Sequence, residues 1–361
     1  MTRPIRIVLM ALAMFVAANV IFAALDLTPQ IARLSAYNAV FPGRERLPFG
    51  NDISQSCNLI VNNLDAMFAS HEIAAGAKPA NEYRVVLIGD SSVWGVLLKP
   101  EETLAAQLNA LGMNKTGKKV RAFNLGYPDF SLAKDLLVLN RALAYQPDLV
   151  IWLVTLNSLP AGRQMDHALA QANAAELKPL LPAFPITPTA QTFLDKTIVG
   201  QRRNLADLAR LQLCGPFWAA THQDQLIRAN YERWSVDLEA DDHFGAFQPP
   251  ALGDSALAFG VLDAGAKLAQ SKGATLLIVN EPMAQSSGKN SDIRYNAFYP
   301  RWAYDQYREQ MTASAKKFGW TYLDLWNVIP FNEFTNSPVH LAPAGSRMLA
   351  ERLGEEIRNG K

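Results

Sequence analysis

The residues best suited to chemistry stand just after five apolar segments of the chain. Gly89, Asp90, Ser91 and Ser92 follow the first segment, Gly126 the second, Asn157 the third and Glu281 the fourth, and His340 stands beyond the fifth. Ligands of an open parallel sheet gather at the carboxyl ends of its strands. If the segments are such strands, a hydroxyl, a glycine, an asparagine and a histidine share one rim.

A serine and a histidine on one rim indicate acyl transfer. The hydroxyl of Ser91 is a weak nucleophile unless a base such as His340 takes its proton. The tetrahedral intermediate needs hydrogen-bond donors, and the backbone N–H groups of Ser91 and Gly126 and the side chain of Asn157 are expected to supply them. Glycine lets the backbone approach an oxyanion without a Cβ in the way. Serine acyl chemistry needs neither a cofactor nor a metal.

Alternating apolar and amphipathic segments predict the elements that carry these residues. The expected strands cover 84–89, 120–125, 149–154, 274–280 and 321–325, and the expected helices cover 101–111, 132–144, 255–270, 302–318 and 343–358. Strands that are apolar throughout are typical of a parallel sheet covered on both faces. The sequence therefore predicts a three-layer α/β/α domain with a parallel, flavodoxin-like sheet.

Two stretches depart from this alternation. Residues 160–250 hold many prolines and two helical pieces, 201–213 and 223–238, so they are interpreted as a helical insertion. Residues 26–80 have mixed polarity and turn signals and are interpreted as an extracytoplasmic lead-in. The predicted organisation is an anchor over 1–25, this lead-in, and a catalytic domain over 81–361 that contains the insertion.

The N-terminus contains a candidate transmembrane helix. Arg3 and Arg6 precede an uncharged run of 19 residues, Ile7–Leu25, whose strongly polar member is Asn19. This run is about long enough to span a bilayer and is long for the apolar core of a signal peptide. We expect an uncleaved single-pass anchor with Asp26 onward outside the cytoplasm, because the two arginines should stay inside. A signal sequence cleaved after residue 23 is the alternative.

The composition argues against several other classes of protein. A formal net charge of +1 gives no reason to expect a nucleic-acid partner. The two cysteines, Cys57 and Cys214, lack metal-ligand spacing; they are either a disulfide of an oxidising compartment or two separate thiols. The stretch Asp241-Asp242-His243 is interpreted as a solvated loop, because no further ligands stand at metal-site spacing.

Four short motifs give the chain a resemblance to the SGNH, or GDSL-type, hydrolase superfamily. Gly89-Asp90-Ser91 resembles the first block of that family, Gly126 in "NLGYP" the second, Asn157 in "TLNS" the third, and His340 in "SPVHLAPAG" the last. Each motif alone is weak, but four in this order are fairly specific. The resemblance implies that Ser91 is the nucleophile and His340 the base. It also implies an oxyanion hole made by Ser91, Gly126 and Asn157.

The last block departs from the family pattern in one respect. The family usually has Asp-x-x-His, whereas this chain has Ser337 at the acidic position and Asn336 before it. Three hypotheses follow. Asn336 or a backbone carbonyl orients His340 in a serine–histidine dyad, a carboxylate such as Glu333 substitutes, or the protein is slow or inactive as an esterase.

Several of these residues also have purely structural interpretations. Asp90 or Ser91 could simply cap the next helix, and Gly126 and Asn157 could be turn residues. In the segment 294–310, the set Tyr295, Tyr299 and Arg301 could bind a sugar, or it could belong to a helix packed on the sheet.

An anchor, an external domain and an SGNH-like site together resemble the branch of that superfamily that acylates and deacylates surface polymers. The resemblance implies a membrane-anchored serine acyltransferase or esterase acting on O-acyl groups of cell-envelope polysaccharide. Its expected partners are an acylated glycan or ester substrate, the membrane, and a membrane-bound O-acyltransferase. A secreted lipase or short-chain esterase is one alternative, and a non-catalytic SGNH-like scaffold is another.

Overall fold

The computed structural model describes residues 2–50, 61–225, 227, 230–253 and 255–360. Its centre is a six-stranded sheet in the order β2-β3-β1-β4-β5-β6. The strands are β1 Glu82–Ile88, β2 Asn114–Lys115, β3 Lys118–Asn124, β4 Leu149–Val154, β5 Thr275–Asn280 and β6 Thr321–Asp324. Strands β3, β1, β4, β5 and β6 pair in parallel, and the short β2 adds an antiparallel edge to β3.

The order of the five parallel strands is that of a flavodoxin-like sheet. The first parallel strand, β1, lies between the second, β3, and the third, β4. Connections from β1 therefore leave in opposite directions on its two sides, which creates the switch point where such sheets bind ligands. The predicted fold class is confirmed, and β2 is an edge strand that the sequence analysis did not predict.

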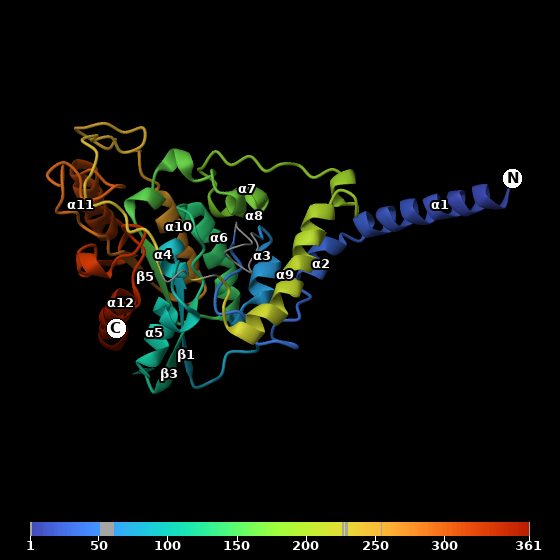
Figure 1. Ribbon diagram of the computed structural model, residues 1–361, viewed down its shortest axis with the longest axis horizontal. Helices are drawn as coiled ribbons and strands as arrows, with labels where there is room; N and C mark the ends of the chain where they lie inside the picture. The colour runs from blue at the N-terminus through green and yellow to red at the C-terminus, as the bar shows by residue number, and fades with distance from the viewer. Residues whose placement is uncertain (1, 51–60, 226, 228–229, 254, 361) are drawn as a thin grey trace.

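Helices cover both faces of the sheet (Figure 1). The larger of the two described hydrophobic clusters includes residues of α6, α10 and α11, and the smaller one includes residues of α5 and α12. The helices are α1 Arg3–Ala24, α2 Leu27–Ala32, α3 Leu64–Ser70, α4 Ser91–Trp94, α5 Leu104–Ala110, α6 Leu132–Ala142, α7 Ala168–Ala172, α8 Ala174–Leu180, α9 Arg202–Thr221, α10 Phe259–Ser271, α11 Arg301–Phe318 and α12 Pro343–Asn359.

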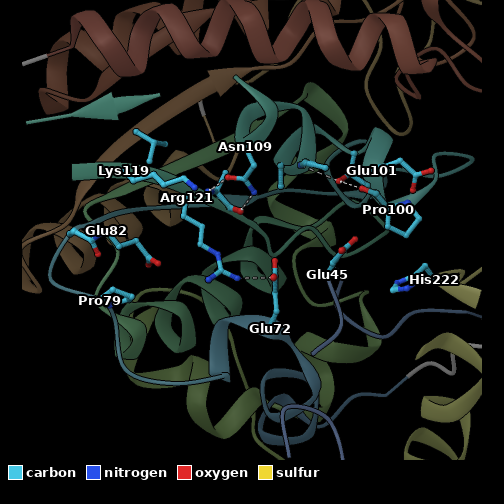
Figure 2. A pocket seen from close by; sticks show the side chains of 16 residues that line it. Glu45, Glu72, Pro79, Glu82, Pro100, Glu101, Asn109, Lys119, Arg121 and His222 are labelled. Atoms are coloured by element: carbon cyan, nitrogen blue, oxygen red, sulfur yellow. Dashed lines mark hydrogen bonds and ion pairs between the residues drawn. The ribbon is translucent and has the colours of Figure 1, made fainter. Parts of the chain in front are cut away.

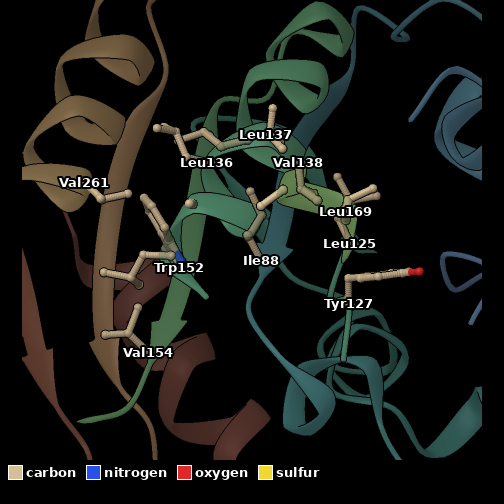
Figure 3. Packing of buried hydrophobic residues seen from close by; sticks show 14 of the residues in the cluster. Ile88, Leu125, Tyr127, Leu136, Leu137, Val138, Trp152, Val154, Leu169 and Val261 are labelled. Carbon is tan, nitrogen blue, oxygen red and sulfur yellow. The ribbon is translucent and has the colours of Figure 1, made fainter. Parts of the chain in front are cut away.

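The core beneath the site joins the sheet to α6 and α10 (Figure 3). Ile88 of β1 and Trp152 of β4 are fully buried there with Leu136 of α6 and Val261 of α10. Gly265 permits this packing, because a Cβ at that position would lie 2.5 Å from the Trp152 ring. Burial of such side chains contributes about 1.5–3 kcal/mol each, which holds the strand ends in place.

The lead-in packs into the main domain. Leu47, Leu64 and Met67 are buried in the same hydrophobic cluster as residues of β1, β3 and β4. A buried ion pair also ties the lead-in to the insertion, because the Arg46 guanidinium donates to Asp224 at 2.8 Å (Nε–Oδ2). The lead-in therefore shares the hydrophobic core of the main domain.

The insertion contains one long helix and a following segment without helix. The predicted helix 201–213 is α9, which continues to Thr221. The helix predicted over 223–238 is wrong: no described residue of that stretch is helical. His222 ends α9 in the left-handed conformation, and the chain then turns so that Asp224 reaches Arg46. The tertiary ion pair thus overrides the local helical pattern.

Helix α1 is long and apolar enough to cross a membrane, by length and composition. Most of its length projects away from the domain (Figure 1). Near its C-terminal end Asn19, Phe22 and Ala23 are buried, and these three positions share one helical face. The same end contacts a short helical turn, Leu194–Lys196, of the insertion.

Candidate active site

The turn after β1 presents Ser91 at the start of α4. Asp90 is the N-cap of this helix, and its Oδ1 accepts a hydrogen bond of 2.8 Å from the Ser92 backbone N–H. The cap interpretation therefore applies to Asp90, the residue before the serine. With the cap supplied by its neighbour, the Ser91 hydroxyl is available for another partner.

That partner is His340. The distance from Ser91 Oγ to His340 Nε2 is 2.9 Å, although the two residues stand 249 positions apart. On the other side of the ring, Asn336 Oδ1 lies 2.9 Å from His340 Nδ1. A carbonyl oxygen can only accept, so Nδ1 carries the proton and Nε2 presents a lone pair to the serine hydroxyl. The three side chains form one hydrogen-bonded chain.

The loop between β6 and α12 holds the histidine in place. Phe334 and Leu341 form an antiparallel bridge across its base, and the Thr335 N–H donates to the His340 carbonyl at 2.8 Å. The Pro338 carbonyl accepts a 2.7 Å hydrogen bond from the Ala284 N–H, which follows β5. The hydrogen bond to Ala284 attaches the loop to the segment after β5, and His340 is thereby held near the end of β1.

Neither Ser337 nor Glu333, the two other side chains considered from the sequence, hydrogen-bonds the His340 ring. The Ser337 side chain is buried, and its oxygen lies 3.5 Å from the Val339 backbone N–H. The Glu333 carboxylate accepts from the Asn332 side chain at 2.9 Å, and its backbone carbonyl accepts from Ala342. Among the partners considered from the sequence, Asn336 is the group that the structure places on Nδ1.

Burial keeps the imidazole neutral. Desolvation lowers the pKa of His340 to about 4, because the charged ring would lose water without gaining a carboxylate neighbour. The ring is thus an unprotonated acceptor at neutral pH, which is the state a general base requires.

Gly126 lies directly against the helix that carries the serine. A Cβ on this residue would stand 2.4 Å from the Trp94 backbone nitrogen and 2.8 Å from the Val93 carbonyl carbon. Its N–H donates to Asn124 Oδ1 at 3.0 Å, and the Asn124 amide donates in turn to the Trp94 carbonyl at 3.3 Å. In this structure the expected oxyanion donor therefore already has a side-chain acceptor.

Asn157 lies in a 3₁₀ turn, Leu156–Ser158, immediately after β4. Its side chain is partly exposed, and no hydrogen bond to it is found within the described residues. Ser91, Gly126 and Asn157 follow three adjacent strands, β1, β3 and β4. The sheet order thus brings all three expected oxyanion-hole residues to the switch point.

A cluster of buried ionisable side chains lies beneath the serine turn, and no role was predicted for this cluster from the sequence. Ser92 Oγ donates to Glu281 Oε2, and both Asp90 and Glu281 are almost fully buried. Lys134 is fully buried as well, with Nζ 3.1 Å from the Gly89 carbonyl and 2.8 Å from Asp135 Oδ1. From the sequence, Glu281 is recognisable only as a polar residue at the end of a strand. Lys134 has no sequence signal of its own, because it falls within the residue pattern of α6.

Burial changes the ionisation of these carboxyl groups. Desolvation raises the pKa of Asp90, an effect that Lys134 offsets only in part. Desolvation, together with the negative charge of Asp90, raises the pKa of Glu281 well above its usual range. A protonated Glu281 avoids a second buried negative charge near Asp90.

Of the residues proposed to bind a sugar, Tyr295 and Tyr299 are buried and Arg301 is partly exposed. Tyr299 is fully buried, with its hydroxyl 2.9 Å from Thr155 Oγ1, and the Tyr295 hydroxyl donates to Asp305 at 2.8 Å. The Arg301 guanidinium lies over the Tyr295 ring and donates to the Ser291 carbonyl at 2.7 Å. The burial of the two tyrosines supports the structural interpretation for them, and sugar binding by this segment stays a prediction.

Two other features lie outside this rim. Asp241, Asp242 and His243 bring their ligand atoms within 4.8 Å of one another in a largely exposed loop. A cavity of about 710 Å³ is lined by residues of β3, α5 and the lead-in, among them Glu45, Glu72 and Arg121 (Figure 2). Ser91 and His340 are not among its lining residues.

The fold and the site together define an α/β/α protein with a serine–histidine pair at the carboxyl ends of its parallel strands. No family model and no curated protein matches the sequence. Several solved structures are similar to the chain, among them G-D-S-L family lipolytic proteins and acetylxylan esterases.

Three of these structures illustrate the likeness. A GDSL-like lipase from Bacteroides thetaiotaomicron is 12% identical, with 79% of this chain and 93% of that chain covered and a TM-score of 0.39. An acetylxylan esterase from Geobacillus stearothermophilus is 13% identical, with 77% and 97% covered and a TM-score of 0.38. A lipolytic G-D-S-L protein from Veillonella parvula is 11% identical, with 75% and 96% covered and a TM-score of 0.36. The likeness concerns the fold, and no site assignment rests on it.

Proposed function

We propose that this protein is a membrane-anchored serine esterase or acyltransferase that acts on O-acyl groups of cell-envelope polysaccharide. The observation that carries the proposal is the hydrogen-bonded chain of Ser91, His340 and Asn336 at the rim of the sheet. Such a chain contains a nucleophile, a base and a group that orients the base, which is the arrangement that activates a serine.

The first half-reaction transfers the acyl group to the enzyme. Ser91 Oγ attacks the ester carbonyl carbon while His340 Nε2 takes the hydroxyl proton, and the carbonyl oxygen becomes an oxyanion. The Ser91 N–H and the Asn157 side chain stabilise that oxygen, and the Gly126 N–H joins them only after it leaves its acceptor, Asn124 Oδ1. When the intermediate collapses, the bond to the leaving alcohol breaks, His340 returns the proton to that alcohol, and an acyl-Ser91 remains.

The second half-reaction releases the acyl group. A hydroxyl of an acceptor attacks the acyl carbon after giving its proton to His340, and the Ser91 Oγ leaves and takes that proton back. Water as the acceptor makes the protein an esterase, and a sugar hydroxyl makes it an acyltransferase. Asn336 keeps the ring in the required tautomer throughout, although it provides less stabilisation of the imidazolium than a carboxylate would.

The cellular setting of the proposal follows from α1. An apolar helix with arginines at its N-terminal end is expected to leave the domain outside the cytoplasm. In that compartment an acylated envelope glycan is an accessible ester, and a membrane-bound O-acyltransferase could supply or receive the acyl group. Cys214 forms no disulfide with any described residue, and Cys57, its possible partner, lies outside the described residues.

Labelling with a fluorophosphonate tests the core of the proposal. The full-length protein in detergent should be modified at neutral pH, and the Ser91→Ala variant should not be. Ser92→Ala is the matched control, since its hydroxyl bonds Glu281 and not His340. A folded wild-type protein that stays unlabelled would instead support the non-catalytic scaffold.

Substrate comparison separates the remaining alternatives. Efficient turnover of small soluble acetate esters, with no gain from polysaccharide, would favour the short-chain esterase or lipase. Slow hydrolysis of such esters, with acyl exchange between an acetylated polysaccharide and an unacetylated one, is the expected result. Mass spectrometry of the acceptor measures that exchange.

A further inference from the structure

The geometry points to a second membrane contact: the turn formed by residues 192–200 lies in the headgroup region of the bilayer that α1 crosses. This inference rests on the proposed anchoring of α1. It assigns a lipid surface as the partner of three exposed apolar side chains in the insertion, and it sets the orientation of the domain relative to the membrane.

The 192–200 turn is firmly built and yet exposes apolar side chains. Phe193 is 51% exposed, Leu194 73% and Val199 46%. The turn is held from within, because Thr197 Oγ1 donates to the Leu194 carbonyl at 2.7 Å and accepts from the Gly200 N–H at 3.1 Å. Large apolar side chains that stay this exposed on an ordered turn are typical of an interaction surface.

This turn also bonds to the C-terminal end of α1 and to the residue just beyond it. The Val199 N–H donates to Asn19 Oδ1 at 3.1 Å, so the polar side chain of the apolar run has a partner in the insertion. Lys196 Nζ lies 3.1 Å from Asp26 Oδ2 just beyond the helix. Residues 19–26 form the end of the proposed span. A turn that is bonded to both Asn19 and Asp26 is therefore placed at the same depth as the outer membrane boundary.

The chemistry of the flanking residues fits a lipid surface. Arg202 and Arg203 are exposed at the start of α9, directly after the turn. Aromatic and aliphatic groups followed by arginines suit the boundary between acyl chains and polar headgroups. Without a membrane, Phe193 and Leu194 would remain in water beside the exposed apolar length of α1.

Fluorescence quenching by labelled lipids tests this placement. Single cysteines are introduced at Leu194, at Leu12 in α1 and at Lys267 in α10, in a background where Cys57 and Cys214 are serine. Each is labelled with an environment-sensitive dye, and the full chain is reconstituted in vesicles of phosphatidylcholine, phosphatidylglycerol and doxyl-labelled phosphatidylcholine. All three sites have exposed side chains, and Lys267 is in the main domain.

The expected result is quenching and a blue shift at positions 194 and 12, with neither at position 267. Quenching at 12 without quenching at 194 would overturn this inference and leave the anchor intact. A label at 12 that is not quenched would overturn the anchor and this inference with it. Equal quenching at all three positions would indicate unspecific adsorption and would also overturn it.

Discussion

At the residue scale, the unusual feature of the site is an amide where a carboxylate is common. The Asn336 oxygen fixes the tautomer of His340 through a 2.9 Å hydrogen bond but adds no negative charge. The pKa of His340 is accordingly lowered by burial alone. This arrangement favours a base that works over a wide pH range, and it gives less stabilisation to the imidazolium that forms during the reaction.

The Asn336→Asp variant tests this account. A carboxylate beside Nδ1 should raise the pKa of His340 by about one to three pH units, because an opposite charge at this distance favours the protonated ring. NMR titration of the imidazole measures the change directly. Where an aryl acetate is turned over, the acidic limb of kcat/KM should move upward by the same amount.

Asn332→Asp is the matched control, since this exposed asparagine of the same loop bonds Glu333. It should leave the titration of His340 nearly unchanged. Equal changes in the two variants would contradict a specific role for Asn336.

Glu281→Gln tests the protonation of the buried carboxyl group. Because the folded-state pKa of Glu281 is raised, the folded protein loses stability as pH rises above the carboxyl's ordinary value. The glutamine cannot ionise, so urea unfolding should show a smaller loss of stability between pH 5 and pH 8. The difference should be about 1.4 kcal/mol for each pH unit by which folding raises the pKa of Glu281. The exposed Glu351→Gln should behave like wild type. An unchanged pH dependence in Glu281→Gln would argue that this carboxylate is ionised in the fold.

At the element scale, the site depends on how closely the end of β3 approaches α4. The backbone of Gly126 lies against the backbone of Val93 and Trp94, and Asn124 bridges the two segments by hydrogen bonds. Since neither partner is a flexible side-chain end, an added methyl group can only be accommodated by moving α4. The placement of Ser91 is therefore coupled to residue 126.

Gly126→Ala should accordingly weaken both folding and labelling. We expect a loss of about 1–3 kcal/mol in the free energy of unfolding, as for overpacked core sites. The rate of fluorophosphonate labelling should fall as well, because Ser91 is displaced from His340. Gly76→Ala is the control, since a Cβ there meets nothing within 4 Å. A Gly126→Ala protein with wild-type stability and labelling would disprove the coupling.

At the scale of the whole molecule, the lead-in and the insertion are joined to the catalytic layer by buried polar contacts. Arg46 donates to Asp224, to the Gly95 carbonyl at 2.9 Å and to the Leu98 carbonyl at 3.1 Å. One buried guanidinium thus connects the lead-in, the insertion and the loop after α4. Removing it leaves a buried carboxylate without that partner, and this is costly in a low-dielectric interior.

Arg46→Ala is expected to destabilise the protein by about 3–5 kcal/mol in urea unfolding. Arg33→Ala provides the comparison, because Arg33 is largely exposed and its nitrogen lies 3.6 Å from Asp65. Exposed pairs contribute about 0–1 kcal/mol, so the second variant should be close to wild type. Similar losses in the two variants would show that the Arg46 network does not hold the parts together.

The sequence by itself determined the layers of the domain and the rim on which polar residues gather. Continuous apolar strands and intervening amphipathic helices predict this sheet, because each pattern is a local property of the sequence and the folded protein retains it. Local patterns failed where distant contacts took over. The stretch 223–238 has a helical pattern in the sequence, but its described residues are not helical, and Asp224 forms an ion pair with Arg46.

Only the tertiary structure decided which side chains meet. The partner of His340 could not be chosen from Asn336, Ser337 or Glu333 on spacing alone, because loop closure between β6 and α12 sets the direction of each side chain. The tyrosines of 295–299 look equally suited to a sugar or a core until their burial is seen. The contact between Glu281 and Ser92 also depends on the strand order. Ser92 follows β1 and Glu281 follows β5, with β4 between these strands, so no periodic pattern in the sequence indicates that the two residues are neighbours.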